Sequence, residues 1–262
     1  MASESGLKMT KRSGWLSGFW NMLSKENGIW WNPRMWLAQS VIWLVLLNGV
    51  FAMALYEGAV ETTSGTPKIV ELFFLLMSQM MPIGVIILTQ GIVVQEKRSG
   101  SAEWVLSAPL SREAFILAKL VANSLWIFAT MVLMQGITFE LVLMAFGVGT
   151  VPILNLFWGL ALQGLYLLFW ITLSLMLGTF FNSRGPVVGI PFAIIVFQKL
   201  IGGLVAKYVP WITFLYPEKV PELAAQVAAG QPIYSTSPLL SMNACVIMFT
   251  LAAIWRFKRE EF

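Results

Sequence analysis

The sequence predicts an all-α integral membrane protein with six transmembrane helices. Of its 262 residues, 58% are hydrophobic and only 11% are charged, whereas soluble domains carry about 25% charged residues. The apolar residues gather into runs close to the roughly 20 residues that a membrane-spanning helix needs. The charged residues are concentrated between these runs, so the composition and its pattern favour the same class.

The apolar runs define the expected spans and divide the chain into two parts. The spans are expected at residues 35–56, 69–94, 113–146, 152–181, 186–208 and 238–255. The turn between the fourth and fifth runs contains Asn182, Gly185 and Pro186, which are typical of helix ends and starts. We therefore expect a cytoplasmic tail with an interfacial helix over residues 1–34, followed by a membrane domain over residues 35–262.

The N-terminal part has the pattern of a helix lying in the membrane interface. Apolar residues recur at helical spacing among basic and polar ones, at Trp15, Leu16, Phe19, Trp20 and Leu23. Such an aromatic face with basic flanks suits the boundary between headgroups and acyl chains. A targeting segment or an unstructured tail is the alternative. The region lacks the apolar core of a signal peptide.

Basic residues predict the orientation of the spans. Of the 17 Lys and Arg residues, only Lys68, Lys207 and Lys219 fall on one side, and Lys199 falls within the fifth expected span. Since Lys and Arg accumulate in cytoplasmic loops, both termini and the stretch 95–119 are expected in the cytoplasm. This distribution explains the net charge of +4, which is not read as a sign of nucleic-acid binding.

The largest outer segment, residues 209–237, is too apolar for a plain loop. A short helix is expected at about 221–229, with Pro221 at its start and Gly230 at its end. The segment either re-enters the membrane from outside or covers a cavity, or it forms a hairpin in the interface.

The stretch from Gln95 to Lys119 is the longest charged interruption. Gly100 and Ser101 are expected to open a short helix over about 100–109, and Pro109 to end it. Ser111 is expected to cap the next helix, with Glu113 in its first turn, where a negative charge suits the helix dipole. A short cytoplasmic helix is thus predicted between the second and third spans.

This stretch resembles the type-2 family of ABC transporter permeases. The family shows an acid after the second span, then Gly-Thr-x-Glu, Leu, Pro, Ser-Arg and Lys. The corresponding residues here are Glu96, Gly100, Ser101, Glu103, Leu106, Pro109, Ser111, Arg112 and Lys119. Ser101 replaces the usual Thr and keeps the hydroxyl. The Asn32-Pro33-Arg34 start of the first span is also similar to the family.

The resemblance implies a permease subunit of an ATP-driven exporter in the cytoplasmic membrane of a prokaryote. In that family the short cytoplasmic helix, called the coupling helix, docks on an ATP-binding subunit. The sequence contains no Gly-x-x-x-x-Gly-Lys-Ser/Thr phosphate loop, so ATP and Mg are expected on a partner ATPase and this chain is expected to have no cofactor or enzymatic activity of its own. Two ATPase copies and a second permease copy, most simply a homodimer, would complete the machine.

Two groups of residues are candidates for these roles. Trp104 is expected to be the buried anchor on the ATPase, because aromatic residues dominate many interfaces. Glu96 and Glu103 are expected to fix the geometry through Arg98, Arg112 or backbone amides. The candidate coupling residues are Glu96, Arg98, Gly100, Ser101, Glu103, Trp104, Leu106, Pro109 and Arg112. The candidate substrate path comprises Gln79, Met80, Gln90 and Lys199.

Other interpretations stay open at this stage. Lys199 is expected to snorkel outward, to pair with Glu140 or to line the substrate path. A secondary transporter or channel without an ATPase is the alternative function. A membrane-embedded enzyme is disfavoured, since the sequence has no His, one Cys, no GxSxG motif and no clustered carboxylates.

Overall fold

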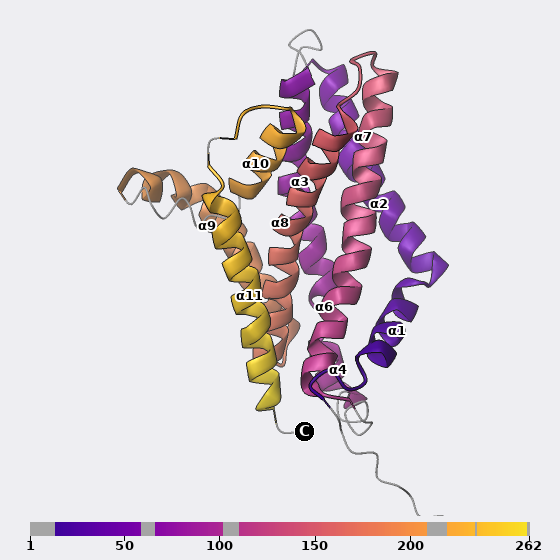
Figure 1. Cartoon of the computed structure of the whole chain (residues 1–262), viewed down its shortest axis with the longest axis vertical. Coiled ribbons are helices and arrows are strands. Elements are labelled where there is room, and N and C mark those ends of the chain that lie inside the picture. Colours follow the sequence, from indigo (N-terminus) through magenta and orange to yellow (C-terminus); the bar gives the residue numbers. More distant parts are fainter. Residues whose placement is uncertain (1–13, 59–65, 102–109, 209–218, 234, 261–262) are drawn as a thin grey trace, which may run out of the picture.

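A computed structural model describes residues 14–58, 66–101, 110–208, 219–233 and 235–260, with only the backbone described for Met35 and residues 199–206. Within these ranges the ordered elements are helices, and no strand occurs among them. The long helices run roughly along one axis and form an elongated bundle (Figure 1). The all-α prediction is therefore confirmed for the described residues.

Five helical stretches in the described residues are long and apolar enough to cross a membrane. They match five of the six expected spans. The first is α2, Pro33–Tyr56, and the second is α3, Thr66–Thr89, which one turn joins to the short α4, Val94–Arg98. The third is α6, Arg112–Phe128, continued by η2, Ala129–Leu133, and α7, Met134–Ala145. The remaining two are α8, Ile153–Phe180, and α11, Ser237–Lys258.

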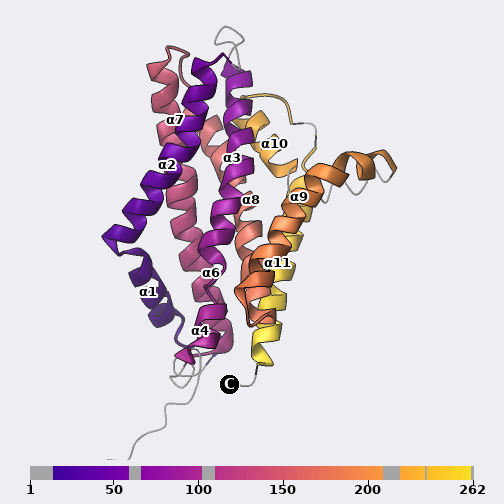
Figure 2. The ribbon, with the colours of Figure 1, turned by 180° about the vertical axis from the view of Figure 1, so that it is seen from behind.

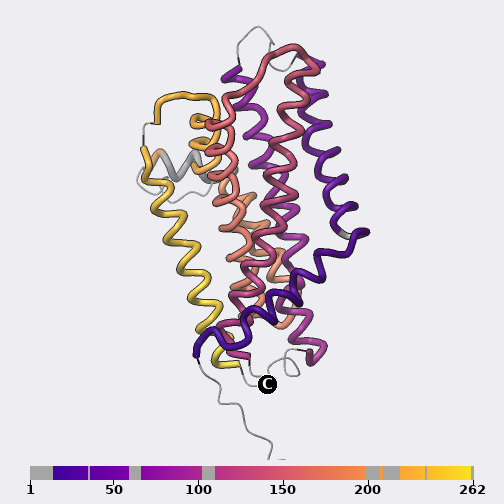
Figure 3. The backbone as a smooth tube through the Cα atoms, turned by 45° about the vertical axis from the view of Figure 1, so that its right-hand side comes forward, coloured from indigo at the N-terminus to yellow at the C-terminus, as the bar shows by residue number. Residues whose placement is uncertain are grey.

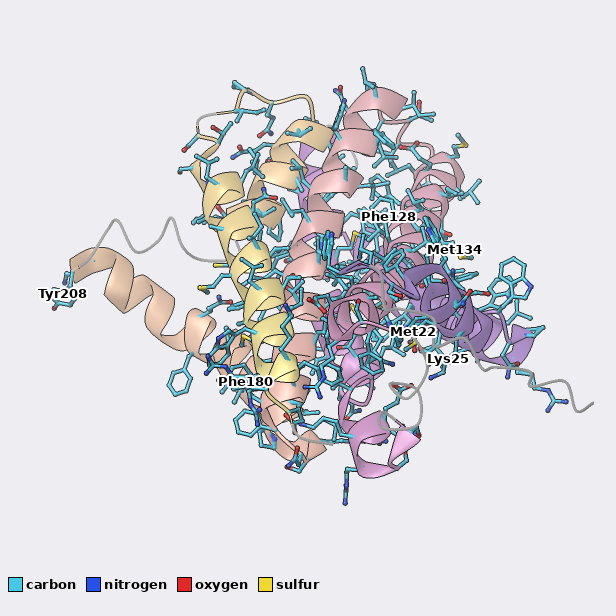
Figure 4. The ribbon with its side chains drawn as sticks, turned by 60° about the horizontal axis from the view of Figure 1, so that its bottom comes forward. Met22, Lys25, Phe128, Met134, Phe180 and Tyr208 are labelled. Carbon is cyan, nitrogen blue, oxygen red and sulfur yellow. The ribbon has the colours of Figure 1, made fainter. Side chains whose placement is uncertain are left out.

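The expected span at 186–208 is not among these five. Helix α9, Arg184–Tyr208, covers this range, and the part of it whose side chains are described, Arg184–Gln198, is apolar, so the sixth span stays a prediction. Pro191 lies inside α9 and removes one hydrogen bond from its ladder. The last turns of α9 project sideways from the bundle (Figure 2), with Tyr208 at the tip (Figure 4).

Helix α8 is the centre of the bundle. In its most apolar stretch 67% of the residues are buried, against 22% for α2 and 17% for α11. Glycines allow its neighbours to approach: a Cβ atom at Gly159 would lie 2.8 Å from the Ala224 carbonyl oxygen, and one at Gly164 would overlap the Phe128 ring. Small residues give such close packing in membranes, where water does not drive helices together.

Two polar contacts inside the bundle compensate for irregular backbone. Pro82 in α3 cannot donate to the Ser78 carbonyl, which accepts a hydrogen bond from the Tyr166 hydroxyl at 3.3 Å instead. In the π-helical turn η2, the Thr130 carbonyl accepts from Gln135 Nε2 at 3.2 Å, and Gln135 Oε1 accepts from Asn48 at 2.7 Å. Because the bilayer core offers no water, such partners are needed there.

Two short helices pack at opposite ends of the bundle. Helix α1, Phe19–Trp30, crosses its base (Figure 3) and packs on α6. Helix α10, Lys219–Ala228, lies near the other end and packs on α8 and α3. The helix expected at 221–229 is present as α10, and its place on the outer side of the membrane stays a prediction. Residues 209–218 lie outside the described residues.

Candidate coupling site

The described parts of the charged stretch, residues 95–101 and 110–119, lie at the same end of the bundle as α1 and the end of α11 (Figure 1). Its two flanks are described up to Ser101 and from Leu110. Glu103, Trp104, Leu106 and Pro109 fall in segment 102–109, outside the described residues. The position of the expected coupling helix therefore stays a prediction, and its anchoring residues form the candidate site.

Local sequence determines where the two flanking helices end and begin. Gly100 has a φ of 71°, a left-handed geometry that favours glycine, and it lies just after the end of α4. Ser101 is again helical, at the position where a new helix was expected to open, and the rest of that helix lies outside the described residues. Ser111 caps α6 as predicted: its Oγ accepts from the Ala114 amide at 3.0 Å. The Ser111 amide donates to the Ser17 carbonyl at 3.0 Å, which attaches the turn before α1 to the start of α6.

Four alternating charges connect α1, α4 and α6. The Lys119 Nζ lies 2.8 Å from Glu26 Oε1 and 3.0 Å from Glu96 Oε2, and Lys25 Nζ lies 2.9 Å from Glu96 Oε1. Only 2% of the Lys119 side chain is exposed, against 43% of Lys25. A buried ammonium is tolerated only with close opposite charges, so the carboxylates on either side of Lys119 hold these helices in one arrangement.

The expected partners of Glu96 are corrected by this arrangement. Glu96 pairs with Lys25 and Lys119, not with Arg98 or Arg112. Arg98 is exposed at the end of α4. Lys25 lies 71 residues before Glu96, on α1 near Met22 (Figure 4), so local spacing did not point to it.

A matched set of polar and aromatic side chains docks α1 on α6. The Trp30 Nε1 donates to Asn123 at 3.2 Å, and the Trp126 Nε1 donates to Asn27 at 3.1 Å. The rings of Trp30 and Trp126 stack with centroids 6.5 Å apart. The expected interfacial helix is therefore attached to the bundle, while Trp20 on its other face is 77% exposed.

Arg112 attaches the start of α6 to the end of α11. Its Nη1 donates to the carbonyls of Phe257 at 3.3 Å and Glu260 at 2.8 Å, and also to that of Lys258. A cation at these carbonyls satisfies groups left without partners at a helix end and suits the helix dipole. Arg112 was expected to fix the geometry of the coupling segment together with Glu96 or Glu103, and its guanidinium binds the end of the C-terminal helix.

Further contacts connect α4 and α6 to the ends of α8 and α11. Lys97 Nζ lies 2.9 Å from Glu260 and donates to the Thr179 carbonyl at 3.1 Å. Lys258 Nζ lies 2.6 Å from Glu113, and the rings of Phe115 and Phe257 stack at 4.8 Å. A cavity of about 360 Å³ opens between the turn before α1, the start of α6 and the end of α11, and Trp15, Ser111 and Lys258 are among the residues that line it.

The three candidate substrate-path residues whose side chains are described, Gln79, Met80 and Gln90, have different surroundings. Gln79 lines a groove between α3 and α10, Met80 packs against the core, and Gln90 donates to its own helix at the Ile87 carbonyl. The side chain of Lys199 lies outside the described residues, whereas Glu140 accepts from the Val151 amide at 3.3 Å. No cluster of possible metal ligands occurs among the described residues.

Comparison with known proteins gives one family. A family model described as "Protein of unknown function (DUF2705)" matches residues 33–262. No curated protein matches the chain. The matched region begins at the first residue of α2 and contains every candidate coupling residue.

Proposed function

The chain belongs to the DUF2705 family, and we propose that it is the permease subunit of an ATP-driven exporter with a separate ATP-binding subunit. The fold supplies several apolar helices able to cross a membrane. The charged stretch 95–119 supplies the resemblance to type-2 ABC permeases. Substrate movement across the cytoplasmic membrane would then be driven by ATP hydrolysed outside this chain.

The observation that carries the proposal is the ion pair between Glu96 and Lys119. It joins the helix before segment 102–109 to the helix after it, with 3.0 Å between the charged atoms. Glu26 and Lys25 extend the connection to α1. A displacement of segment 102–109 would therefore move α1, α4 and α6 together, which is what a coupling helix requires of its anchors.

The second supporting feature is the connection of this base to the central helices. Lys97 reaches the Thr179 carbonyl near the end of α8, and Arg112 reaches the end of α11. Since α8 is the most buried span, a displacement of α4 would be transmitted through Lys97 to the helix at the centre of the bundle. We propose that two permease copies and two ATPase copies, the latter holding ATP and Mg, form the working machine.

Co-purification tests the proposal. The full chain is expected to retain an ATP-binding protein with a phosphate loop when it is extracted in mild detergent, in a ratio of two to two by native mass spectrometry. Purification as an active transporter without any ATPase would contradict the proposal and favour a secondary transporter or channel.

A further inference from the structure

A stripe of residues runs along the outside of α3 and α4 toward the coupling end of the bundle. It comprises Ile87, Gly91, Gln95 and Arg98, which are spaced by three or four residues. The turn between the two helices keeps this spacing on one side, because the Gln95 amide donates to the Gly91 carbonyl at 3.0 Å, as in a helix. Ile87 is 51% exposed, and Gln95 and Arg98 are exposed as well. The stripe therefore faces the surroundings of the bundle.

Arg184, the first residue of α9, lies across this stripe. Its Nη2 donates to Gln95 Oε1 at 3.0 Å. A Cβ atom at Gly91 would lie 3.6 Å from the same nitrogen, so the guanidinium rests against the turn between α3 and α4. Arg98 follows Gln95 by three residues and lies on the same side of α4. Two arginines from different helices thus flank one neutral amide.

The two arginines carry charge that the protein does not neutralise. Among the residues that the structure describes, neither Arg98 nor Arg184 has an acidic partner. The acids described at this end already pair with other lysines or arginines, and they are Glu26, Glu96, Glu113 and Glu260. A guanidinium binds phosphate oxygens with two parallel hydrogen bonds. An anion with phosphate chemistry therefore complements this part of the stripe.

The arginine pair lies at the level of a membrane boundary. Phe180 and Phe181 end α8 and are 42% and 36% exposed (Figure 4 labels Phe180). Aromatic residues gather where the hydrocarbon meets the headgroups, and Arg184 follows this pair after a short turn. The guanidinium of Arg184 is therefore placed where lipid phosphates lie.

Polar and apolar groups follow each other along the stripe in the order that a phospholipid has. Arg98 is outermost, Gln95 and Gly91 come next, and Ile87 and Ile83 continue toward the middle of the bundle. From Gly91 to Ile83 the axis rises by about 12 Å, which is within one half of the roughly 30 Å hydrocarbon thickness. A phosphate at the arginines therefore directs its acyl chain onto the isoleucines.

We propose that this stripe binds one anionic phospholipid of the leaflet at the coupling end, the cytoplasmic leaflet in the expected orientation. Its phosphate lies between Arg98 and Arg184, and one acyl chain lies along Ile87 and Ile83. A zwitterionic lipid fits less well, because its ammonium would lie beside two guanidinium groups. The bound lipid would connect α4 to the start of α9. The proposal requires that the chain spans a membrane, and it does not depend on an ATPase partner.

Native mass spectrometry of the full chain, titrated with phosphatidylglycerol or phosphatidylethanolamine of identical acyl chains, tests the proposal. Wild type is expected to retain one phosphatidylglycerol per chain and to bind phosphatidylethanolamine more weakly. Arg98→Gln and Arg184→Gln should each weaken phosphatidylglycerol about fivefold, the effect of one cation near a membrane surface. The double variant should bind the two lipids equally. If one arginine variant does not fold, the other decides, because each arginine makes its own contact.

Arg34→Gln is the matched control and should leave the preference unchanged. Arg34 is also an exposed arginine, at the start of α2 and away from α9 (Figure 2). Excess glycerol phosphate should not displace the lipid, because it lacks the acyl chains. Equal retention of both lipids by wild type, a preference that survives in the double variant, displacement by glycerol phosphate, or an equal effect of Arg34→Gln overturns the proposal.

Discussion

Lys119 and Glu96 form a 3.0 Å ion pair that joins the helices on either side of segment 102–109. The same ammonium lies 2.8 Å from Glu26 on α1. One almost fully buried lysine therefore links the N-terminal helix to both flanks of the candidate coupling segment. Lys25, the other lysine that pairs with Glu96, is much more exposed than Lys119, and the first prediction depends on this difference.

Lys119→Met should destabilise the protein far more than Lys25→Met. Removing Lys119 leaves Glu26, itself 5% exposed in its side chain, without its buried cation, at a cost of about 3 to 5 kcal/mol. Lys25 is 43% exposed, and its loss should cost less than about 1 kcal/mol. Thermal unfolding in detergent compares the two, and equal losses would contradict the assigned burial.

Arg112→Gln should loosen the end of α11. The guanidinium that binds three terminal carbonyls is lost, at a local cost of about 1 to 2 kcal/mol. Hydrogen exchange should accelerate in residues 255–260, while the exposed Arg98→Gln serves as the charge-matched control. Unchanged exchange in Arg112→Gln would show that this cap does not hold the helix.

Gly159→Ala should displace α10 from α8. The added Cβ would lie 2.7 Å from Ala228 Cβ and 2.8 Å from the Ala224 carbonyl, and such overpacking costs about 1 to 3 kcal/mol. Gly49→Ala meets nothing within 4 Å and is the control. Faster proteolysis or exchange of residues 219–230 is expected in the first variant alone.

Single-cysteine labelling should place the two ends of the bundle on opposite sides of the membrane. In a Cys245→Ser background, Glu57→Cys and Thr150→Cys should react with an impermeant maleimide from outside, and Ser183→Cys only after permeabilisation. All three positions are exposed. Labelling of Ser183→Cys in intact cells would reverse the orientation expected from the basic residues.

The sequence alone was sufficient for the helical class and for five spans, because the length of an apolar run is set by bilayer thickness. The Ser111 cap was also predictable, since its signal is local. The irregular turn η2 was not, because Gln135, which donates to the Thr130 carbonyl, is itself bound by Asn48, a residue 87 positions away. The range 186–208 is helical, as its composition suggested, and its role as a sixth span stays a prediction.

The coupling site was predicted only in part, because some of its contacts join residues far apart in the sequence. Glu96 was identified from its place in a motif, but its partner Lys25 is 71 residues away. A usable signal did exist: Lys119, Asn123 and Trp126 share one face of a helix, as do Glu26 and Trp30. Matching polar and aromatic faces on two helices predict docking, and local motif spacing does not reveal it.

ATP hydrolysis in reconstituted vesicles tests the central claim most directly. The partner ATPase is assayed with wild type, with Trp104→Ala or Pro109→Ala in the coupling segment, and with Trp20→Ala, an exposed tryptophan on α1, as control. The account predicts that wild type and Trp20→Ala alter the hydrolysis rate, whereas the segment variants bind the ATPase more weakly and lose that effect. Full assembly and unchanged hydrolysis with both segment variants would contradict it.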